Sequence, residues 1–372
     1  MNVINFHLTN SCNYHCTYCF GKFPDKKELT FSEACRVVDN IASFFLKNGI
    51  ADGRINLAGG EPLLYSYLDD LIDYINAYGI KVSVITNGSL LTEERIALWK
   101  DKVSCIGLSI DSALPETNTA IGRCCNNKTL TVKQAVRITQ AIHRNGIMLK
   151  INTVVSKLNV NEDMTEIYRR LKPDRLKLLQ VEIVEGINDC AAKFAINKKS
   201  FDEFCKRHKN CCGNLVPEYS EDMENSYLMV NPQGEFQLND SGEYKIYGNC
   251  LEEELNEIFN RIPISINKFN SRYGKESSPE IITEKIYVFG GFPTWIKEIK
   301  KYLINAKFFK DDLHSLDVIR NADEIWIQSN AISHSFYGKV VDAARANGIP
   351  VQYFNCAGVA KCVEQVILKK LS

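Results

Sequence analysis

The chain has 372 residues and no formal net charge, because 45 lysines and arginines balance 45 aspartates and glutamates. This balance argues against stable nucleic-acid binding or a basic membrane-binding surface, and no run of about 18 apolar residues predicts a membrane span. The 14 cysteines, without a recognisable secretion signal, indicate thiols in a reducing compartment, so we expect a cytoplasmic protein.

The first predicted strand, 3–8, leads directly into a cysteine-rich loop. Cys12, Cys16 and Cys19 stand in a C-x3-C-x2-C array, and soft thiolates at this spacing favour an iron–sulfur cluster or zinc. A [4Fe–4S] cluster usually has four cysteine ligands, so three would leave one iron open for another ligand. The alternatives are a structural zinc with His15 as fourth ligand and a chance spacing of ordinary cysteines.

Strands and helices alternate after this loop. The capping box of Thr30 and Glu33 opens the first helix, which ends near Gly49. Further helices are predicted at 63–78, 92–100, 132–144 and 162–171, and the six strands at 3–8, 54–58, 81–86, 105–110, 148–155 and 175–183. This alternation predicts βαβ units and a parallel sheet.

The two faces of the predicted strands differ in polarity. One alternate set is apolar, whereas the other is often polar and includes Lys150, Arg175 and Lys177. A closed barrel fills its interior with apolar side chains, so we predict instead a partial barrel with a wet, cationic lumen for an anionic ligand. A solvent-facing sheet is the alternative. Active sites in such folds lie at the carboxyl ends of the strands, where the cysteine loop also falls.

The segment Ala58-Gly-Gly-Glu-Pro62 follows the second strand, and together with the cysteine array it resembles the radical S-adenosylmethionine (SAM) enzymes. Residues 2–274 resemble the viperin-like family within that superfamily, through segments such as 86–90, 118–123, 150–154, 158–166, 215–218 and 225–228. The resemblance implies a [4Fe–4S] cluster on the three cysteines, with SAM on its open iron. It also implies SAM contacts from Tyr18, Gly59, Gly60, Glu61, Pro62, Thr86 and Ser109.

The same resemblance implies a reaction. The reduced cluster cleaves SAM to methionine and a 5′-deoxyadenosyl radical, which takes the 4′ hydrogen of a ribonucleoside triphosphate. Loss of the 3′ hydroxyl, with uptake of one electron and one proton, then gives a 3′-deoxy-3′,4′-didehydro nucleotide and water. Such a product terminates RNA chains, which implies antiviral (phage) defence, and a flavodoxin- or ferredoxin-type donor would supply electrons. Substrate contacts are implied for Asn5, Lys150, Asn152, Arg175 and Lys177, with Tyr227 as proton donor.

Alternatives remain for these assignments. Tyr227 is otherwise an ordinary strand aromatic, and the three cations are otherwise members of structural ion pairs. The base stays open between CTP, UTP and GTP, because Arg54, Ala58 and 239–247 depart from the animal enzyme. The alternative functions are a radical SAM reaction on a peptide or another nucleotide, and a nucleotide-sensing defence module.

We predict three parts of the chain. Residues 1–184 form the partial (βα)6 radical SAM barrel, and 185–278 form an extension that caps it, with a hairpin of strands 227–230 and 235–238 around Asn231–Gly234. After a polar linker, 272–280, residues 284–372 form a small doubly wound, Rossmann-like α/β domain of unknown function. Its predicted elements are strands 285–289, 324–328 and 351–354 and helices 294–302, 335–346 and 359–371, with Gly290 and Gly291 as a candidate phosphate turn.

Overall fold

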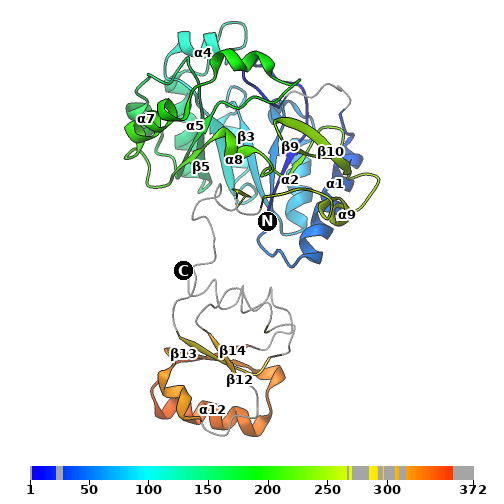
Figure 1. The fold of residues 1–372 in the computed structure, drawn as a ribbon, viewed down its shortest axis with the longest axis vertical. Helices are drawn as coiled ribbons and strands as arrows, with labels where there is room; N and C mark the ends of the chain where they lie inside the picture. Colours follow the sequence, from blue (N-terminus) through cyan, green and yellow to red (C-terminus); the bar gives the residue numbers. More distant parts are fainter. Residues whose placement is uncertain are drawn as a thin grey trace. The chain divides into compact units, whose positions relative to one another are not determined.

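The computed structural model describes residues 2–21, 28–265, 268–269, 285–291, 296, 306–309 and 316–354. The chain divides into two compact units, Met1–Gly274 and Lys275–Ser372 (Figure 1). Within the described ranges, no helix combines the length and the apolar character needed to cross a lipid bilayer.

The first unit contains a sheet whose ten described strands run in the order β10-β9-β8-β1-β2-β3-β4-β5-β6-β7. Every neighbouring pair from β8 to β7 is parallel, and only the β8-β9 and β9-β10 pairs are antiparallel. The six predicted strands of the α/β fold are therefore confirmed. The bounds are β1 Val3–His7, β2 Arg54–Ala58, β3 Lys81–Thr86, β4 Cys105–Ser109, β5 Met148–Val155, β6 Arg175–Gln180, β7 Leu215–Glu218, β8 Met229–Val230, β9 Glu235–Asp240 and β10 Glu243–Asn249.

Helices pack on the apolar face of this sheet and form the main core with it. The helix Phe31–Lys47 begins with the predicted capping box of Thr30 and Glu33, and the helix Val132–Arg144 begins with a second one, of Thr131 and Gln134, that was not predicted. The helices of the first unit are α1 Phe31–Lys47, α2 Leu68–Ala77, α3 Glu93–Leu98, α4 Pro115–Ile121, α5 Val132–Arg144, α6 Thr165–Leu171, α7 Lys198–His208, α8 Ser220–Met223 and α9 Leu255–Phe259, with 3₁₀ turns at Pro62–Leu64 and Asp189–Phe194.

The extension after residue 184 continues the barrel sheet at both of its edges. β7 pairs with β6 at one edge, while β8 pairs with β1 at the other and carries the β9-β10 hairpin. Figure 1 shows this hairpin beside the N-terminal elements, although more than 200 residues separate β1 from β9 in the sequence. β7 and β10 were not predicted. β7 has only four residues and contains Pro217, which an edge strand tolerates.

The predicted hairpin is confirmed, but its first strand is shorter than expected. β8 begins at Met229 rather than at Tyr227, so Tyr227 lies in the segment before the strand. The main-chain oxygen of Leu228 accepts hydrogen bonds from both the backbone and the side-chain nitrogen of Asn5. This contact fixes the segment of Tyr227 against the centre of the sheet.

The second unit has a four-stranded parallel sheet in its described part, in the order β12-β11-β13-β14. Its elements are β11 Ile286–Phe289, β12 Lys307–Phe309, β13 Glu324–Gln328, α12 His334–Ala346 and β14 Val351–Phe354. The three predicted strands and the helix 335–346 are confirmed, whereas β12 was not predicted. The predicted linker 272–280 and the helix 359–371 lie outside the described residues, as does the helix 294–302 apart from residue 296.

Gly290 and Gly291 follow β11 with φ values of +81° and +110°. A Cβ at Gly290 would lie 2.6 Å from the backbone oxygen of Ala331, so close packing of two loops already requires this glycine. That they cradle a phosphate stays a prediction.

Candidate active site

Two loops meet at the carboxyl ends of β1 and β2, as the sequence predicts for its two main motifs. The backbone nitrogen of Gly60 donates to the oxygen of Thr9 at 2.7 Å, and that of Glu61 donates to the oxygen of Ser11 at 2.8 Å. Gly59 has a φ of +142°, and a Cβ at Gly60 would lie 2.2 Å from the Ser11 oxygen. The glycines therefore allow the backbone of this loop to lie directly against the cysteine loop.

Replacing Gly60 with alanine is expected to lower the free energy of unfolding by about 1–3 kcal/mol and to weaken SAM binding. The new methyl group can be accommodated only if one loop moves away from the other. Denaturant unfolding and SAM titration measure the two effects. Gly213→Ala is the matched control, because a Cβ there meets nothing within 4 Å. Full SAM affinity in the Gly60 variant would show that the close approach is not required.

Glu61 is fully buried and accepts hydrogen bonds from the end of β3. Its Oε1 accepts hydrogen bonds from the Thr86 hydroxyl at 2.7 Å and the Leu63 nitrogen at 3.2 Å, and its Oε2 accepts one from the Asn87 nitrogen at 2.8 Å. Burial raises the pKa of Glu61, although these hydrogen bonds oppose the shift. Glu61, Thr86 and Pro62, which starts a 3₁₀ turn, are thus brought together as predicted, while their contact with SAM stays a prediction.

The three thiols of the cysteine loop lie close enough that, in addition to burial, a charge on Cys19 raises the pKa of Cys12 and of Cys16. The backbone nitrogen of Cys19 donates to the oxygen of Cys16 at 3.2 Å, which closes the loop locally. Burial raises the pKa of Cys12 and raises that of Cys16 to about 12. A buried thiolate therefore needs a positive partner, and bound iron is such a partner.

Arg123 supplies a positive charge beside this loop that the sequence analysis did not single out. Its guanidinium donates to the Cys16 sulfur at 3.8 Å and to the Ser109 oxygen at 2.8 Å, and it pairs with Asp111 at 2.9 Å. Burial lowers the pKa of Arg123, but the Asp111 carboxylate opposes this and the net shift is upward. Arg123 ends the segment 118–123 that carried the family resemblance, which is the one signal that could have identified it.

Tyr18 joins the same network from the cysteine loop. Its hydroxyl donates to Asp111 at 2.7 Å, and its ring packs with Ile121 and Val181 in a small apolar cluster. Burial raises the pKa of Tyr18 well above its usual value. Tyr18 and Ser109, both predicted to bind SAM, are therefore connected through Asp111 and Arg123. Their contact with SAM stays a prediction.

The predicted substrate cations lie side by side on β5 and β6, in two neighbouring rows that run across the strands. Lys150 is in register with Arg175, and Asn152 with Lys177. Strand β4 continues both rows, because Gly107 pairs with Lys150 and Ser109 with Asn152. A Cβ at Gly107 would lie 2.3 Å from the Ile85 side chain, 3.0 Å from that of Lys150 and 3.3 Å from that of Asn152, so this glycine leaves room for all three.

A polar row also crosses the first three strands on the side of Asn5. The Asn56 amide donates to the Asn5 side-chain oxygen at 2.7 Å, and the Ser83 hydroxyl donates to that of Asn56 at 2.8 Å. His7 lies two residues further along β1, where burial lowers its pKa to about 4 and keeps the ring neutral. The predicted polar inner face thus extends from β1 to β6.

Lys177 and Tyr227 meet at a buried carboxylate. Lys177 Nζ lies 2.6 Å from Glu218 Oε2 and donates to the Tyr227 oxygen at 2.9 Å, while the Tyr227 hydroxyl donates to Glu218 at 2.7 Å. Lys177 thus forms a structural ion pair, which was the alternative to a substrate contact for this residue. The same contact brings Lys177 to Tyr227, as the proposed site requires. Glu218 was missed as a site residue, although it ends the segment 215–218.

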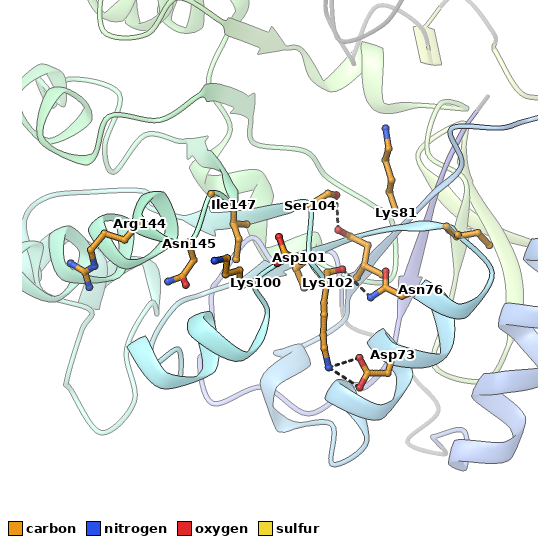
Figure 2. A pocket seen from close by; sticks show the side chains of 15 residues that line it. Asp73, Asn76, Lys81, Lys100, Asp101, Lys102, Ser104, Arg144, Asn145 and Ile147 are labelled. Atoms are coloured by element: carbon orange, nitrogen blue, oxygen red, sulfur yellow. Dashed lines mark hydrogen bonds and ion pairs between the residues drawn. The ribbon is translucent and has the colours of Figure 1, made fainter. Parts of the chain in front are cut away.

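An open hollow of about 850 Å³ lies at the opposite, amino ends of β3, β4 and β5 (Figure 2). Lys81, Lys100 and Lys102 contribute to its lining, and Lys102 Nζ pairs with Asp73 at 2.7 Å. None of the residues that the sequence predicts for the active site lines it. Because chemistry in this class of fold is placed at the carboxyl ends of the strands, we assign the hollow no catalytic role.

The residues present fit the two cofactors that the sequence analysis predicts. Three soft thiolates lie on one loop with Arg123 beside Cys16 to offset negative charge. Within the described ranges, no three His, Cys, Asp or Glu side chains are arranged as ligands of one metal ion. A cluster does not require that arrangement, since each thiolate binds its own iron. The glycine loop lies against the cysteine loop, Asn87 after β3 donates to the Cys12 sulfur at 4.0 Å, and Arg123 connects Cys16 to Ser109 at the end of β4.

Comparison with known proteins agrees with this arrangement. Residues 6–171 match the model of the Radical SAM superfamily. An S-adenosylmethionine-dependent nucleotide dehydratase of Selenomonas ruminantium is 33% identical over 278 residues, which cover 73% of this chain and 98% of that protein. One of Flammeovirga pacifica is 34% identical over 280 residues, which cover 73% and 94%.

Solved structures support the fold alone. The structure of anSMEcpe with bound AdoMet and the Kp18Cys peptide has a TM-score of 0.53 at 15% identity and covers 93% of this chain and 96% of that one. Streptococcus suis SuiB bound to S-adenosylmethionine has a TM-score of 0.52 at 15% identity, with 70% and 66% covered.

Proposed function

We propose, since the chain belongs to the S-adenosylmethionine-dependent nucleotide dehydratases of the radical SAM superfamily, that it dehydrates a ribonucleoside triphosphate. The family uses a [4Fe–4S] cluster and SAM as cofactors. The proposed product is the 3′-deoxy-3′,4′-didehydro form of CTP, UTP or GTP. The observation that supports this most is that Lys150, Arg175 and Lys177 lie in adjacent rows and that Lys177 contacts Tyr227.

Residues of the two loops and of β3 and β4 would hold the cofactors. Cys12, Cys16 and Cys19 are the proposed cluster ligands, and Arg123 offsets the negative charge of the Cys16 thiolate. When bound, the cluster and SAM supply the radical that removes a hydrogen atom from the substrate. The proposed SAM contacts are Tyr18, Gly59, Gly60, Glu61, Pro62, Thr86 and Ser109.

The inner face of β5 and β6 would bind the triphosphate. Charge-assisted hydrogen bonds from Lys150, Arg175 and Lys177 would stabilise its anionic oxygens in a buried site, and Asn5 and Asn152 supply neutral polar contacts. Tyr227 carries a proton on its phenol oxygen and would give it to the departing 3′ hydroxyl. An electron-transfer protein of the flavodoxin or ferredoxin type would supply the electrons.

A didehydro nucleotide lacks the 3′ hydroxyl from which a polymerase extends an RNA chain. The proposed cellular role is therefore antiviral, phage-directed defence. What supports this role is the chain-terminating chemistry of the proposed product.

The test is an anaerobic incubation of reconstituted protein with dithionite, SAM and either CTP, UTP, GTP or ATP, followed by mass spectrometry. We expect one nucleotide to yield a product lighter by one water, together with 5′-deoxyadenosine. 5′-Deoxyadenosine without any altered nucleotide would contradict the proposed substrate and would favour a peptide or another nucleotide.

Replacing Lys150 with methionine is expected to raise the KM for the nucleotide about 10–100-fold, the range expected when one charge-assisted hydrogen bond is lost. The initial rate of 5′-deoxyadenosine formation against nucleotide concentration gives this constant. Lys133→Met on the exposed face of α5 is the control. An unchanged KM in the Lys150 variant would show that this row does not bind the triphosphate.

A further inference from the structure

Glu218 is a buried carboxylate that the proposed reaction leaves without a role. It ends β7, and its side chain is 1% exposed. One oxygen, Oε2, lies 2.6 Å from Lys177 Nζ and accepts the Tyr227 hydroxyl at 2.7 Å. We propose that Glu218 is a positioning residue that fixes the Tyr227 hydroxyl for proton donation and competes with the substrate's phosphates for Lys177. The inference rests on the proposed function of this site.

The competition follows from charge and burial. Lys177 is 9% exposed, so its ammonium has little access to water that could screen its neighbours. A triphosphate that reaches Lys177 places anionic oxygens close to the Glu218 carboxylate, and the two anions repel one another. Glu218 therefore weakens binding of the phosphate end. In the absence of nucleotide it satisfies a buried cation, which would otherwise be costly to leave unpaired.

Glu218 also holds the side chain of Tyr227 in position. Tyr227 lies in the segment between α8 and β8, outside regular structure, and the Leu228 oxygen beside it bonds to Asn5 of β1. Its hydroxyl donates to the ionised Glu218, accepts from Lys177, and its ring lies 5.3 Å from Lys177 Nζ. A charged acceptor forms a shorter and stronger hydrogen bond than a neutral one. Glu218 thus orients the one phenol proton that the reaction is proposed to use.

The charge of the Glu218 carboxylate repels the phosphates, whereas its position holds the phenol. Removing the charge should therefore affect binding and turnover in opposite directions. Glu218→Gln keeps the size of the side chain but removes its charge. We expect triphosphates to bind this variant about tenfold more tightly, while kcat falls about tenfold because the neutral amide holds the phenol less firmly. Damage to the fold would instead weaken binding and turnover together.

Glu218→Asp is the second variant, since it keeps the charge but withdraws the carboxylate by one methylene. We expect its affinity for triphosphates to stay within about twofold of the unaltered protein, while kcat falls because the carboxylate no longer reaches the phenol. Glu221→Gln is the control, because Glu221 is 70% exposed and its pair with Lys198 at 3.3 Å is solvent-screened. We expect no change in either constant for that variant.

The experiment is calorimetric titration of the cluster-loaded full chain with CTP, UTP, GTP and inorganic triphosphate, followed by measurement of kcat and KM with the nucleotide that turns over. Tighter binding of both nucleotide and inorganic triphosphate to Glu218→Gln, with a lower kcat, supports the inference. Unchanged or weaker binding overturns it, even when the unaltered chain binds and converts a nucleotide. If the unaltered chain bound none of these probes, the proposed function would fail first and the inference with it.

Discussion

Replacing Cys16 with alanine is expected to remove the iron–sulfur cluster and reduce turnover to background. The chain offers a cluster three thiolates, so the loss of one leaves two irons without a protein ligand. Reconstituted protein should contain about four irons per chain, whereas the variant should contain less than about one. Iron analysis, the visible absorption of the cluster and the rate of 5′-deoxyadenosine formation check the three consequences.

The control is Cys35→Ser on α1, because Cys35 packs against the main core and is not on the cysteine loop. It should retain the full iron content. Retention of about four irons in the Cys16 variant would contradict the ligand set. About eight irons in the unaltered chain would instead indicate a second cluster and would favour the peptide-modifying or other radical SAM reactions.

Replacing Tyr227 with phenylalanine is expected to lower kcat about 10²–10³-fold, because a positioned proton donor contributes on that scale. The ring remains, and the ion pair of Lys177 and Glu218 does not require the phenol, so the nucleotide affinity should change by less than about threefold. Steady-state kinetics and nucleotide titration separate the two constants. SAM cleavage should become uncoupled from nucleotide conversion, which the ratio of 5′-deoxyadenosine to altered nucleotide measures.

Tyr74→Phe is the control for this variant. Its hydroxyl donates to Asp39 on α1 at 2.7 Å, away from the inner face of the sheet. No change in kcat is expected there. A Tyr227 variant with unaltered kcat would mean that the late proton comes from another group, and Tyr227 would then be an ordinary aromatic residue of this segment.

The sequence predicted the parallel α/β architecture well because its signals are local. The capping box at Thr30 and Glu33 and the periodicity of α5 depend on residues close together in the chain, and both elements appear where they were predicted. The alternation along β5 likewise matches its burial, which changes at every residue. Lys150 on the inner face follows from that alternation, whereas β6, with Arg175 and Lys177, is buried at all six positions.

The features that the sequence did not predict depend on contacts between segments far apart in the chain. β7 has four residues with a proline, so its place beside β6 follows from tertiary pairing and not from periodicity. Glu218 and Lys177 are far apart in the sequence, and only that pairing brings their charges together. Arg123 reaches Cys16 because the backbone oxygens of Ile121 and Gly122, at the end of α4, accept hydrogen bonds from backbone nitrogens of the cysteine loop, which no spacing in the sequence reveals.

The measurement that tests the central claim most directly is isotope transfer from the nucleotide. Reconstituted protein is incubated anaerobically with SAM and the ribonucleoside triphosphate that turns over, labelled with deuterium at the 4′ position. If the chain dehydrates the nucleotide as proposed, the 5′-deoxyadenosine gains one deuterium and the altered nucleotide has none at 4′. Unlabelled 5′-deoxyadenosine beside an unchanged nucleotide would contradict the account.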